Sequence, residues 1–213
     1  MIVSPAFAGK RYAVLGLARS GLTAVETLLA SGAQVTAWDN CEEPRQKLEG
    51  RVETADPVSI DLTGFDGVVV SPGVPLNKHP IAGHAASYGV PVIGDIELFA
   101  LARESLPAHR VVGITGTNGK STTTALIGHL LSKNGWDAQV GGNIGRGVLD
   151  LAPPREGTIY VLELSSYQLD LAPTLKPNVA LLLNITPDHL ERHGGMDGYI
   201  AAKRRIFARQ GTG

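Results

Sequence analysis

The feature that most constrains this chain is a strand, a glycine-rich loop and a helix in direct succession at residues 110–133. Residues 110–115 form a β-rich, mostly apolar run, as in a strand, and GTNGKST at residues 116–122 leads into a helical pattern over residues 123–133. Such a loop directs the backbone N–H groups at the helix start toward an anion. The segment therefore predicts a parallel α/β sheet with a phosphate site at its carboxyl edge.

The residues of this loop have the chemistry of a phosphate cradle. Lys120 could reach the β- and γ-phosphates, and the Ser121 hydroxyl could ligate magnesium. The strict P-loop pattern has glycine six positions before its lysine, where this chain has Ile114. We interpret the segment as a variant phosphate loop, with a surface Gly-Lys turn as the alternative. The predicted nucleotide-binding residues are Gly116, Thr117, Asn118, Gly119, Lys120, Ser121 and Thr122.

Glu163 stands near the end of another apolar run, at residues 159–164. Magnesium prefers oxygen ligands, so Ser121, Glu163, phosphate oxygens and water form a coherent set. Taken alone, Glu163 could equally be an exposed acid at a strand end. Together with the phosphate loop, it predicts a magnesium nucleotide site.

Short apolar runs alternate with helical patterns along the chain, which is typical of parallel strands joined by crossover helices. One series ends before Pro107 and a second follows, so we place the domains at 1–106 and 107–213. Asp95 is the expected cap of the last helix in the first series. The predicted fold is a Rossmann-like α/β domain followed by a truncated P-loop ATPase-type α/β domain whose sheet would leave an open edge.

A glycine turn at residues 16–21 joins the first strand to the first helix, and Asp39 follows the next strand at the spacing of a ribose contact. The nicotinamide fingerprint requires glycine where this chain has Ala18. Arg19 could instead bind a diphosphate at the helix start. Nucleotide binding and a purely structural turn are therefore both open at this point.

Two histidines, His189 and His193, lie four residues apart and could face one side of a helix. A zinc site would need a His-Glu-x-x-His pattern or a third ligand, and neither is evident. Lys203, in AAKRRIF, is most simply part of a basic helix face above an apolar stripe. Neither feature defines a site by itself.

Bulk composition excludes several other functions. The 213 residues carry 19 Lys and Arg against 20 Asp and Glu, so no basic face predicts nucleic acid or an anionic membrane as a partner. Cys41 is the only cysteine, which excludes an internal disulfide. There is no secretory signal and no apolar run of transmembrane length, so we expect a soluble, cytoplasmic protein.

Five ordered sequence blocks resemble the Mur ligase family of ATP-dependent enzymes. They are GITGTNGKST at 113–122, GGNIG at 141–145, ELSSYQL at 163–169, NITPDHLERHG at 184–194 and AAKRRIF at 201–207. The ELSSYQL form and the opening Gly-Leu-x-x-Ser-Gly turn are most similar to the members that add D-glutamate. The resemblance spans essentially the whole chain.

The resemblance implies roles that the residue patterns alone do not establish. The first domain would hold the UDP part of the substrate, and the second would bind ATP with Mg²⁺. A second magnesium would lie near His189 and a carbamylated Lys203, whose carbamate would replace a cation by oxygen ligands. Lys120, His189 and Lys203 would be catalytic, and Ser121, Glu163, His189 and Lys203 would hold metal. The implied substrate-binding residues are Arg19, Ser20, Asp39, Asn40, Ser71, Gly73, Asn143, Ser165 and Gln168.

The implied reaction is ATP-dependent ligation of D-glutamate to UDP-N-acetylmuramoyl-L-alanine through an acyl phosphate, in peptidoglycan precursor synthesis. Family members continue with the rest of the ATPase sheet and a carboxyl-terminal domain that we expect to be absent here. We therefore expect this chain alone to bind nucleotide weakly and not to ligate, and the intact enzyme to be a monomer. Two other classes stay open: a nicotinamide-dependent oxidoreductase and a non-catalytic P-loop nucleotide-binding module.

Overall fold

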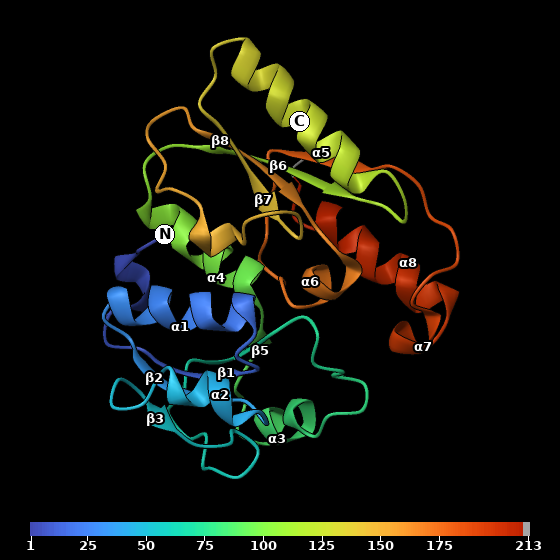
Figure 1. Ribbon diagram of the computed structural model, residues 1–213. Helices are drawn as coiled ribbons and strands as arrows, with labels where there is room; N and C mark the ends of the chain where they lie inside the picture. The colour runs from blue at the N-terminus through green and yellow to red at the C-terminus, as the bar shows by residue number, and fades with distance from the viewer. Residues whose placement is uncertain (211–213) are drawn as a thin grey trace.

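The computed structural model describes residues 1–210, which form two parallel β-sheets with helices packed against them (Figure 1). The first sheet has the strand order β3-β2-β1-β4-β5, and the second has the order β7-β8-β6-β9. Every strand pair in both sheets is parallel. The α/β fold predicted from the alternating sequence pattern is therefore confirmed.

The first unit follows the expected alternation closely. The strand β3 was not expected, because its two residues are exposed and carry no apolar signal. The elements are η1 (Pro5–Phe7), β1 (Arg11–Leu15), α1 (Arg19–Ala30), β2 (Gln34–Trp38), α2 (Glu42–Gln46), β3 (Glu53–Thr54), β4 (Gly67–Val70), α3 (Ile81–Ser87), β5 (Val92–Ile93), α4 (Asp95–Ala102) and η2 (Arg103–Ser105).

The second unit contains two short helices, α6 and α7, that the sequence pattern does not predict. Its phosphate-loop helix begins at Lys120, earlier than expected, because Gly119 adopts a left-handed backbone (φ 83°) that starts the helix there. The elements are β6 (Arg110–Thr115), α5 (Lys120–Lys133), β7 (Ala138–Gly142), η3 (Val148–Asp150), β8 (Ile159–Glu163), α6 (Ser166–Asp170), β9 (Val179–Leu182), α7 (Leu190–His193), α8 (Met196–Arg204) and η4 (Arg205–Phe207).

The prediction that Asp95 caps α4 is wrong. Gly94, with an extended backbone, is the capping residue, and Asp95 is the first residue of the helix itself. Its Oδ1 accepts a hydrogen bond from the Ile96 N–H at 3.0 Å. The side chain is buried between the two units, and this burial raises the pKa of Asp95 to about 6.

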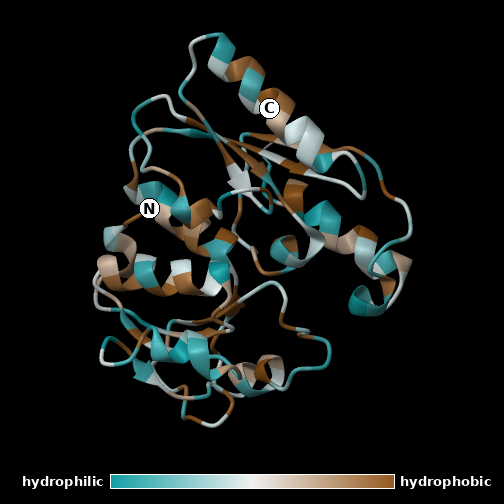
Figure 2. Ribbon diagram, viewed as in Figure 1, coloured by the Kyte–Doolittle hydropathy of each residue, from teal (hydrophilic) through white to brown (hydrophobic). Residues whose placement is uncertain are grey.

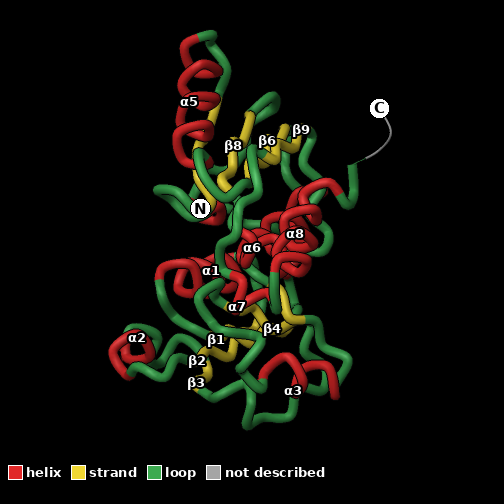
Figure 3. Tube along the Cα trace, turned by 90° about the vertical axis from the view of Figure 1, so that its right-hand side faces the viewer, coloured by secondary structure: helices red, strands yellow, loops and turns green. Residues whose placement is uncertain are grey.

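Helices α1 and α4 lie between the two sheets (Figure 1), and the turned view shows α1 in the same place (Figure 3). Both helices carry hydrophobic residues (Figure 2), and one hydrophobic core includes buried residues of both units. Phe99 on α4 packs edge-on against Tyr160 on β8, with ring centroids 5.2 Å apart. The Ile2 N–H donates to the Leu149 carbonyl at 2.8 Å, so the amino terminus also crosses between units. The chain passes from the first sheet to the second between α4 and β6. The domain boundary near Pro107 stays a proposal, because the two units share one hydrophobic core.

None of the helices found within residues 1–210 combines the length and the apolar character needed to cross a membrane.

Candidate functional site

A cavity of about 300 Å³ lies where the strands of the second sheet end and the first unit approaches them. Gly73 follows β4, Lys120 follows β6, Asn143 follows β7 and Ser165 follows β8, so four strand ends contribute. Ligands of open α/β sheets bind at such carboxyl edges. The remaining lining residues are Pro72, Ser166, Tyr167, Asp188, His189, Tyr199 and Lys203.

The phosphate loop is held in place by Asn184, which follows β9. The Asn118 N–H donates to Asn184 Oδ1 at 2.9 Å, and Asn184 Nδ2 donates to the Asn118 carbonyl at 3.0 Å. Lys120 Nζ donates to the Thr117 carbonyl at 2.8 Å, while Ser121 and Thr122 are exposed at the start of α5. Asn184 thus holds the loop in place from the end of the neighbouring strand, and Lys120 of the loop lines the cavity.

Glu163 ends β8 as a buried carboxylate that is only 2% exposed. Its Oε1 accepts a hydrogen bond from Asn143 Nδ2 at 2.8 Å, but its Oε2 has no hydrogen-bond partner. An unpaired buried carboxylate oxygen is costly unless a cation meets it. The neighbouring Gly142 has φ 94°, and a Cβ there would lie 2.3 Å from the Glu163 carbonyl oxygen, so only glycine lets the two strands converge.

Lys203 on α8 is buried, 2% exposed, and its Nζ donates to the Gly116 carbonyl at 2.8 Å. The ammonium also lies 4.7 Å from the centre of the Tyr199 ring. Burial, together with the positive charge of Lys120, lowers the pKa of Lys203 to about 8. The simple interpretation of Lys203 as part of an exposed basic helix face is therefore wrong, because α8 turns this side chain toward the phosphate loop.

His189 and His193 do not form a metal pair. His189 precedes α7 with a left-handed backbone (φ 51°), the one positive φ at a non-glycine residue within 1–210. His193 already has partners at both ring nitrogens, since Nδ1 lies 3.2 Å from Asp170 Oδ2 and Nε2 lies 2.9 Å from Ser166 Oγ. Burial lowers the pKa of His193, although Asp170 opposes this shift.

The predicted UDP-contacting residues gather at the carboxyl edge of the first sheet. Ser71 Oγ donates to the Gly16 carbonyl at 2.7 Å, and Ser20 Oγ lies 3.4 Å from Ser71 Oγ. Both carboxylate oxygens of Asp39 accept backbone N–H groups, from Leu17 at 2.6 Å and from Cys41 at 2.9 Å. Asp39 therefore holds the glycine turn against the next strand. Exposed residues at this edge include Arg19 and Asn40.

Gln168 does not face the cavity directly. It is 3% exposed, and its Oε1 accepts from the Ser165 N–H at 3.1 Å within a capping box at the start of α6. The Ser165 Oγ in turn accepts from the Gln168 N–H at 3.2 Å. Gln168 thus supports Ser165, which does line the cavity.

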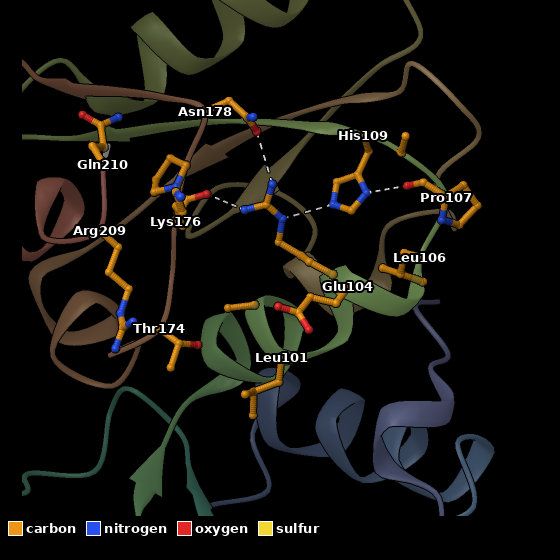
Figure 4. A pocket seen from close by; sticks show the side chains of 14 residues that line it. Leu101, Glu104, Leu106, Pro107, His109, Thr174, Lys176, Asn178, Arg209 and Gln210 are labelled. Atoms are coloured by element: carbon orange, nitrogen blue, oxygen red, sulfur yellow. Dashed lines mark hydrogen bonds between the residues drawn. The ribbon is translucent and has the colours of Figure 1, made fainter. Parts of the chain in front are cut away.

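A larger hollow, of about 1140 Å³, lies at the opposite edge, near the amino ends of β6 and β9 (Figure 4). Arg103 donates there to His109 Nε2, to the Lys176 carbonyl and to Asn178 Oδ1. Arg209 donates to the Pro173 carbonyl. Since the guanidinium of Arg103 is occupied by these three partners and no strand found within residues 1–210 has its carboxyl end here, the smaller cavity is the better candidate for chemistry.

Several cavity residues were missed by sequence reasoning. Asp188 lies 3.4 Å from His189 Nε2, and Tyr199 Oη lies 3.0 Å from Thr117 Oγ1. The polar run around Asn184 could have indicated Asp188 and Asn184 as loop residues at a strand end. Nothing in the sequence indicated Tyr199, because its place depends on how α8 packs.

The fold and the cavity define the class of protein to which this chain belongs: a Rossmann-like α/β unit is joined to a P-loop-type α/β unit. Residues 10–94 match the family described as "Mur ligase MurD-like, N-terminal domain", and residues 114–213 match "Mur ligase middle domain". The chain belongs to the Mur ligase family and comprises its MurD-like N-terminal domain and its middle domain.

Curated relatives support this assignment over nearly the whole chain. UDP-N-acetylmuramoylalanine–D-glutamate ligase of Novosphingobium aromaticivorans is 67% identical over 210 residues, which cover 99% of this chain and 47% of that protein. The ligase of the same name from Sphingopyxis alaskensis is 62% identical, covering 99% of this chain and 49% of that protein. The chain therefore spans about half the length of these relatives.

A solved structure shares the fold at low sequence identity. The UDP-N-acetylmuramate:L-alanyl-gamma-D-glutamyl-meso-diaminopimelate ligase of Neisseria meningitides aligns with a TM-score of 0.58 and 18% identity, over 97% of this chain and 70% of that one. This similarity concerns the fold alone.

Proposed function

We propose that this chain carries the substrate and ATP sites of a ligase that joins D-glutamate to UDP-N-acetylmuramoyl-L-alanine. The observation that carries the proposal is the cavity between the two sheets. It is lined by a phosphate-loop lysine, Lys120, and by a buried, weakly basic lysine, Lys203 on α8. The carboxyl end of β8, the strand that bears Glu163, contributes Ser165 to the same lining. The names of the two curated relatives described above supply the substrate.

In the proposed reaction, the carboxylate of the alanyl group attacks the γ-phosphorus of ATP, and the bond from that phosphorus to the bridging oxygen of ADP breaks. The amine of D-glutamate then attacks the acyl phosphate and releases inorganic phosphate. Lys120, fixed by the loop, is placed to stabilise negative charge on the transferring phosphoryl oxygens. Lys203 and His189 face the same cavity, where the carboxylate would be held.

Magnesium fits the residues that this chain offers. The Glu163 Oε2 is buried and unpaired, and the Ser121 hydroxyl is exposed at the helix start. These two oxygens, together with phosphate and water, would hold a hard cation. Bound there, Mg²⁺ would neutralise charge on the β- and γ-phosphates.

We also propose that Lys203 is carbamylated in the working enzyme. Carbamylation requires a neutral amine, and burial already lowers the pKa of Lys203 to about 8. The product is an anionic oxygen ligand beside His189, suited to a second magnesium. Incubation with carbon-13 bicarbonate should give a carbamate carbon signal in NMR that Lys203→Arg lacks. An identical signal from that variant, or none from the wild-type chain, would contradict the proposal.

Calorimetric titration of the chain with UDP-N-acetylmuramoyl-L-alanine, and separately with ATP and magnesium, tests the proposed function. We expect saturable binding of the UDP ligand that weakens in Gly73→Val, and magnesium-dependent binding of ATP that weakens at least tenfold in Lys120→Ala. Absence of UDP-ligand binding, with ATP binding retained, would favour a non-catalytic P-loop module instead.

A nicotinamide-dependent oxidoreductase is disfavoured by the first glycine turn. Ala18 stands where the dinucleotide fingerprint has glycine, whose missing side chain would let the backbone approach a pyrophosphate. Fluorescence quenching by reduced nicotinamide cofactor measures this alternative. We expect no quenching at micromolar concentrations of the cofactor.

We further propose a cytoplasmic location and a monomeric state for the working enzyme.

A further inference from the structure

Three side chains outside the predicted site form a continuous polar chain that ends in the cavity. Asp170 Oδ2 lies 3.2 Å from His193 Nδ1, and His193 Nε2 lies 2.9 Å from Ser166 Oγ. Ser166 is the first residue of α6 and lines the cavity, while His193 ends α7. The chain therefore joins two short helices beneath the cavity.

The imidazole of His193 is held in one orientation. Its side chain is 4% exposed and stacks on Tyr167, with ring centroids 5.5 Å apart and planes 29° apart. The ring of Tyr199 lies against it at the same centroid distance, 5.5 Å. A side chain packed in this way cannot exchange its two nitrogens by flipping without displacing both tyrosines.

Asp170 is oriented as well. Arg205 Nε donates to its Oδ1 at 3.2 Å, which leaves Oδ2 facing His193. A carboxylate that faces Nδ1 attracts a proton on that nitrogen and repels a lone pair. A neutral imidazole has one N–H and one acceptor nitrogen, so Nε2 must be the acceptor.

This tautomer decides what Ser166 offers to a ligand. If Nε2 accepts, the Ser166 hydroxyl hydrogen points at His193, and the oxygen lone pairs are left for the cavity. Among the charged groups that line the cavity, the Lys120 ammonium is a donor suited to a carboxylate. Ser166, which is 2% exposed, thus adds a buried hydrogen-bond acceptor to the same cavity.

An N-acyl amino acid matches this combination, because its amide N–H and its carboxylate are attached to the same carbon. We propose that Ser166 accepts a hydrogen bond from the amide N–H of an N-acyl amino acid whose carboxylate lies in the same cavity as the Lys120 ammonium, and that His193 and Asp170 are positioning residues for Ser166. The inference rests on the proposed function and specifies how the acyl amino acid is selected.

The substitution Asp170→Asn should reverse the polarity of the chain. Arg205 donates to the oxygen on its side, so the new amide would place its NH₂ group toward His193. Nδ1 would then accept, Nε2 would carry the proton and donate to Ser166 Oγ, and the serine hydroxyl hydrogen would turn into the cavity. The serine would change from acceptor to donor without a change in shape.

Calorimetry with two ligands tests this reversal: UDP-N-acetylmuramoyl-L-alanine and its ester analogue, in which L-lactate replaces L-alanine and oxygen replaces the N–H. The wild-type chain should bind the amide about tenfold more tightly, a difference of about 1.4 kcal/mol. Asp170→Asn should lose or reverse this preference, and Ser166→Ala should lose it. Asp197→Asn, at an exposed position on α8, is the matched control and should keep it.

Nitrogen-15 NMR of labelled histidine gives a readout that is independent of ligand. His193 should be protonated at Nδ1 in the wild-type chain and at Nε2 in Asp170→Asn. A wild-type ring protonated at Nε2, or equal affinity of the wild-type chain for amide and ester, would overturn the inference while leaving the proposed function intact. Failure of the wild-type chain to bind either ligand would refute the proposed function, and this inference with it.

Discussion

Replacing Glu163 by glutamine should make the ligand-free chain more stable while removing its response to magnesium. The wild-type carboxylate is 2% exposed and has one oxygen without a partner. Leaving a buried acceptor unsatisfied costs about 1–3 kcal/mol, and more when it is charged. Glutamine keeps the oxygen that accepts from Asn143 and removes the charge, so we expect a gain of about 1 kcal/mol.

For a domain of this size, about 1 kcal/mol corresponds to a rise of about 2–4 °C in melting temperature. ADP with magnesium at 100 times its dissociation constant should stabilise the wild-type chain by about 2.7 kcal/mol. Glu163→Gln should lose the part of this stabilisation that depends on magnesium, because the unpaired Oε2 is the proposed ligand. The substitution should therefore raise the stability of the ligand-free chain and lower the stabilisation by magnesium. A residue that only supports the fold would not be expected to change these two quantities in opposite directions.

Scanning calorimetry with ADP, in magnesium or in chelator, measures both effects. The exposed Glu156→Gln is the matched control and should behave as wild type in both conditions. The reasoning fails if Glu163→Gln is less stable than wild type without ligand, or if magnesium stabilises both proteins equally in the presence of ADP.

Three further predictions concern the shared core and the loop. Asp95→Asn should gain stability relative to wild type as pH rises from 4.5 to 7.5, by roughly 2–3 kcal/mol in urea unfolding. The pKa of Asp95 is raised to about 6, so its ionisation on that rise costs the folded state, and a pH-independent difference would contradict this. Phe99→Ala should cost about 3–5 kcal/mol yet leave one unfolding transition, because Phe99 packs on Tyr160 of the other unit; two transitions would show separable units. Lys120→Ala should weaken ATP binding at least tenfold by calorimetry while melting as wild type does, and unchanged affinity would remove the loop from the site.

The sequence predicts those parts of the site that lie at strand ends. Lys120 follows the buried strand β6 and Glu163 ends the buried strand β8. Parallel strands bring their carboxyl ends to one edge, so local patterns suffice to place both. Gly73 and Asn143 follow strands in the same way. For these residues, the parallel topology of the sheets is enough to explain why they lie at the cavity.

Residues on α6, α7 and α8 cannot be placed in this way. Helices α6 and α7 have five and four residues, too few for hydrophobic periodicity to define a buried face. Lys203 lies on a longer helix, but a helical pattern alone shows a basic side chain and not the carbonyl of Gly116 that it meets. Only family resemblance indicated its role, and it implied no role for Ser166 or Asp170.

We propose that ATP and the substrate carboxylate meet in the cavity between the two units. A crystal structure of the chain with UDP-N-acetylmuramoyl-L-alanine, a non-hydrolysable ATP analogue and magnesium tests it most directly. We predict magnesium about 2.1 Å from Glu163 Oε2, the terminal phosphate beside Lys120, and the alanyl carboxylate between that phosphate and Lys203. A nucleotide bound elsewhere, for example in the hollow beside Arg103, or a Glu163 Oε2 that faces no cation, would contradict the account.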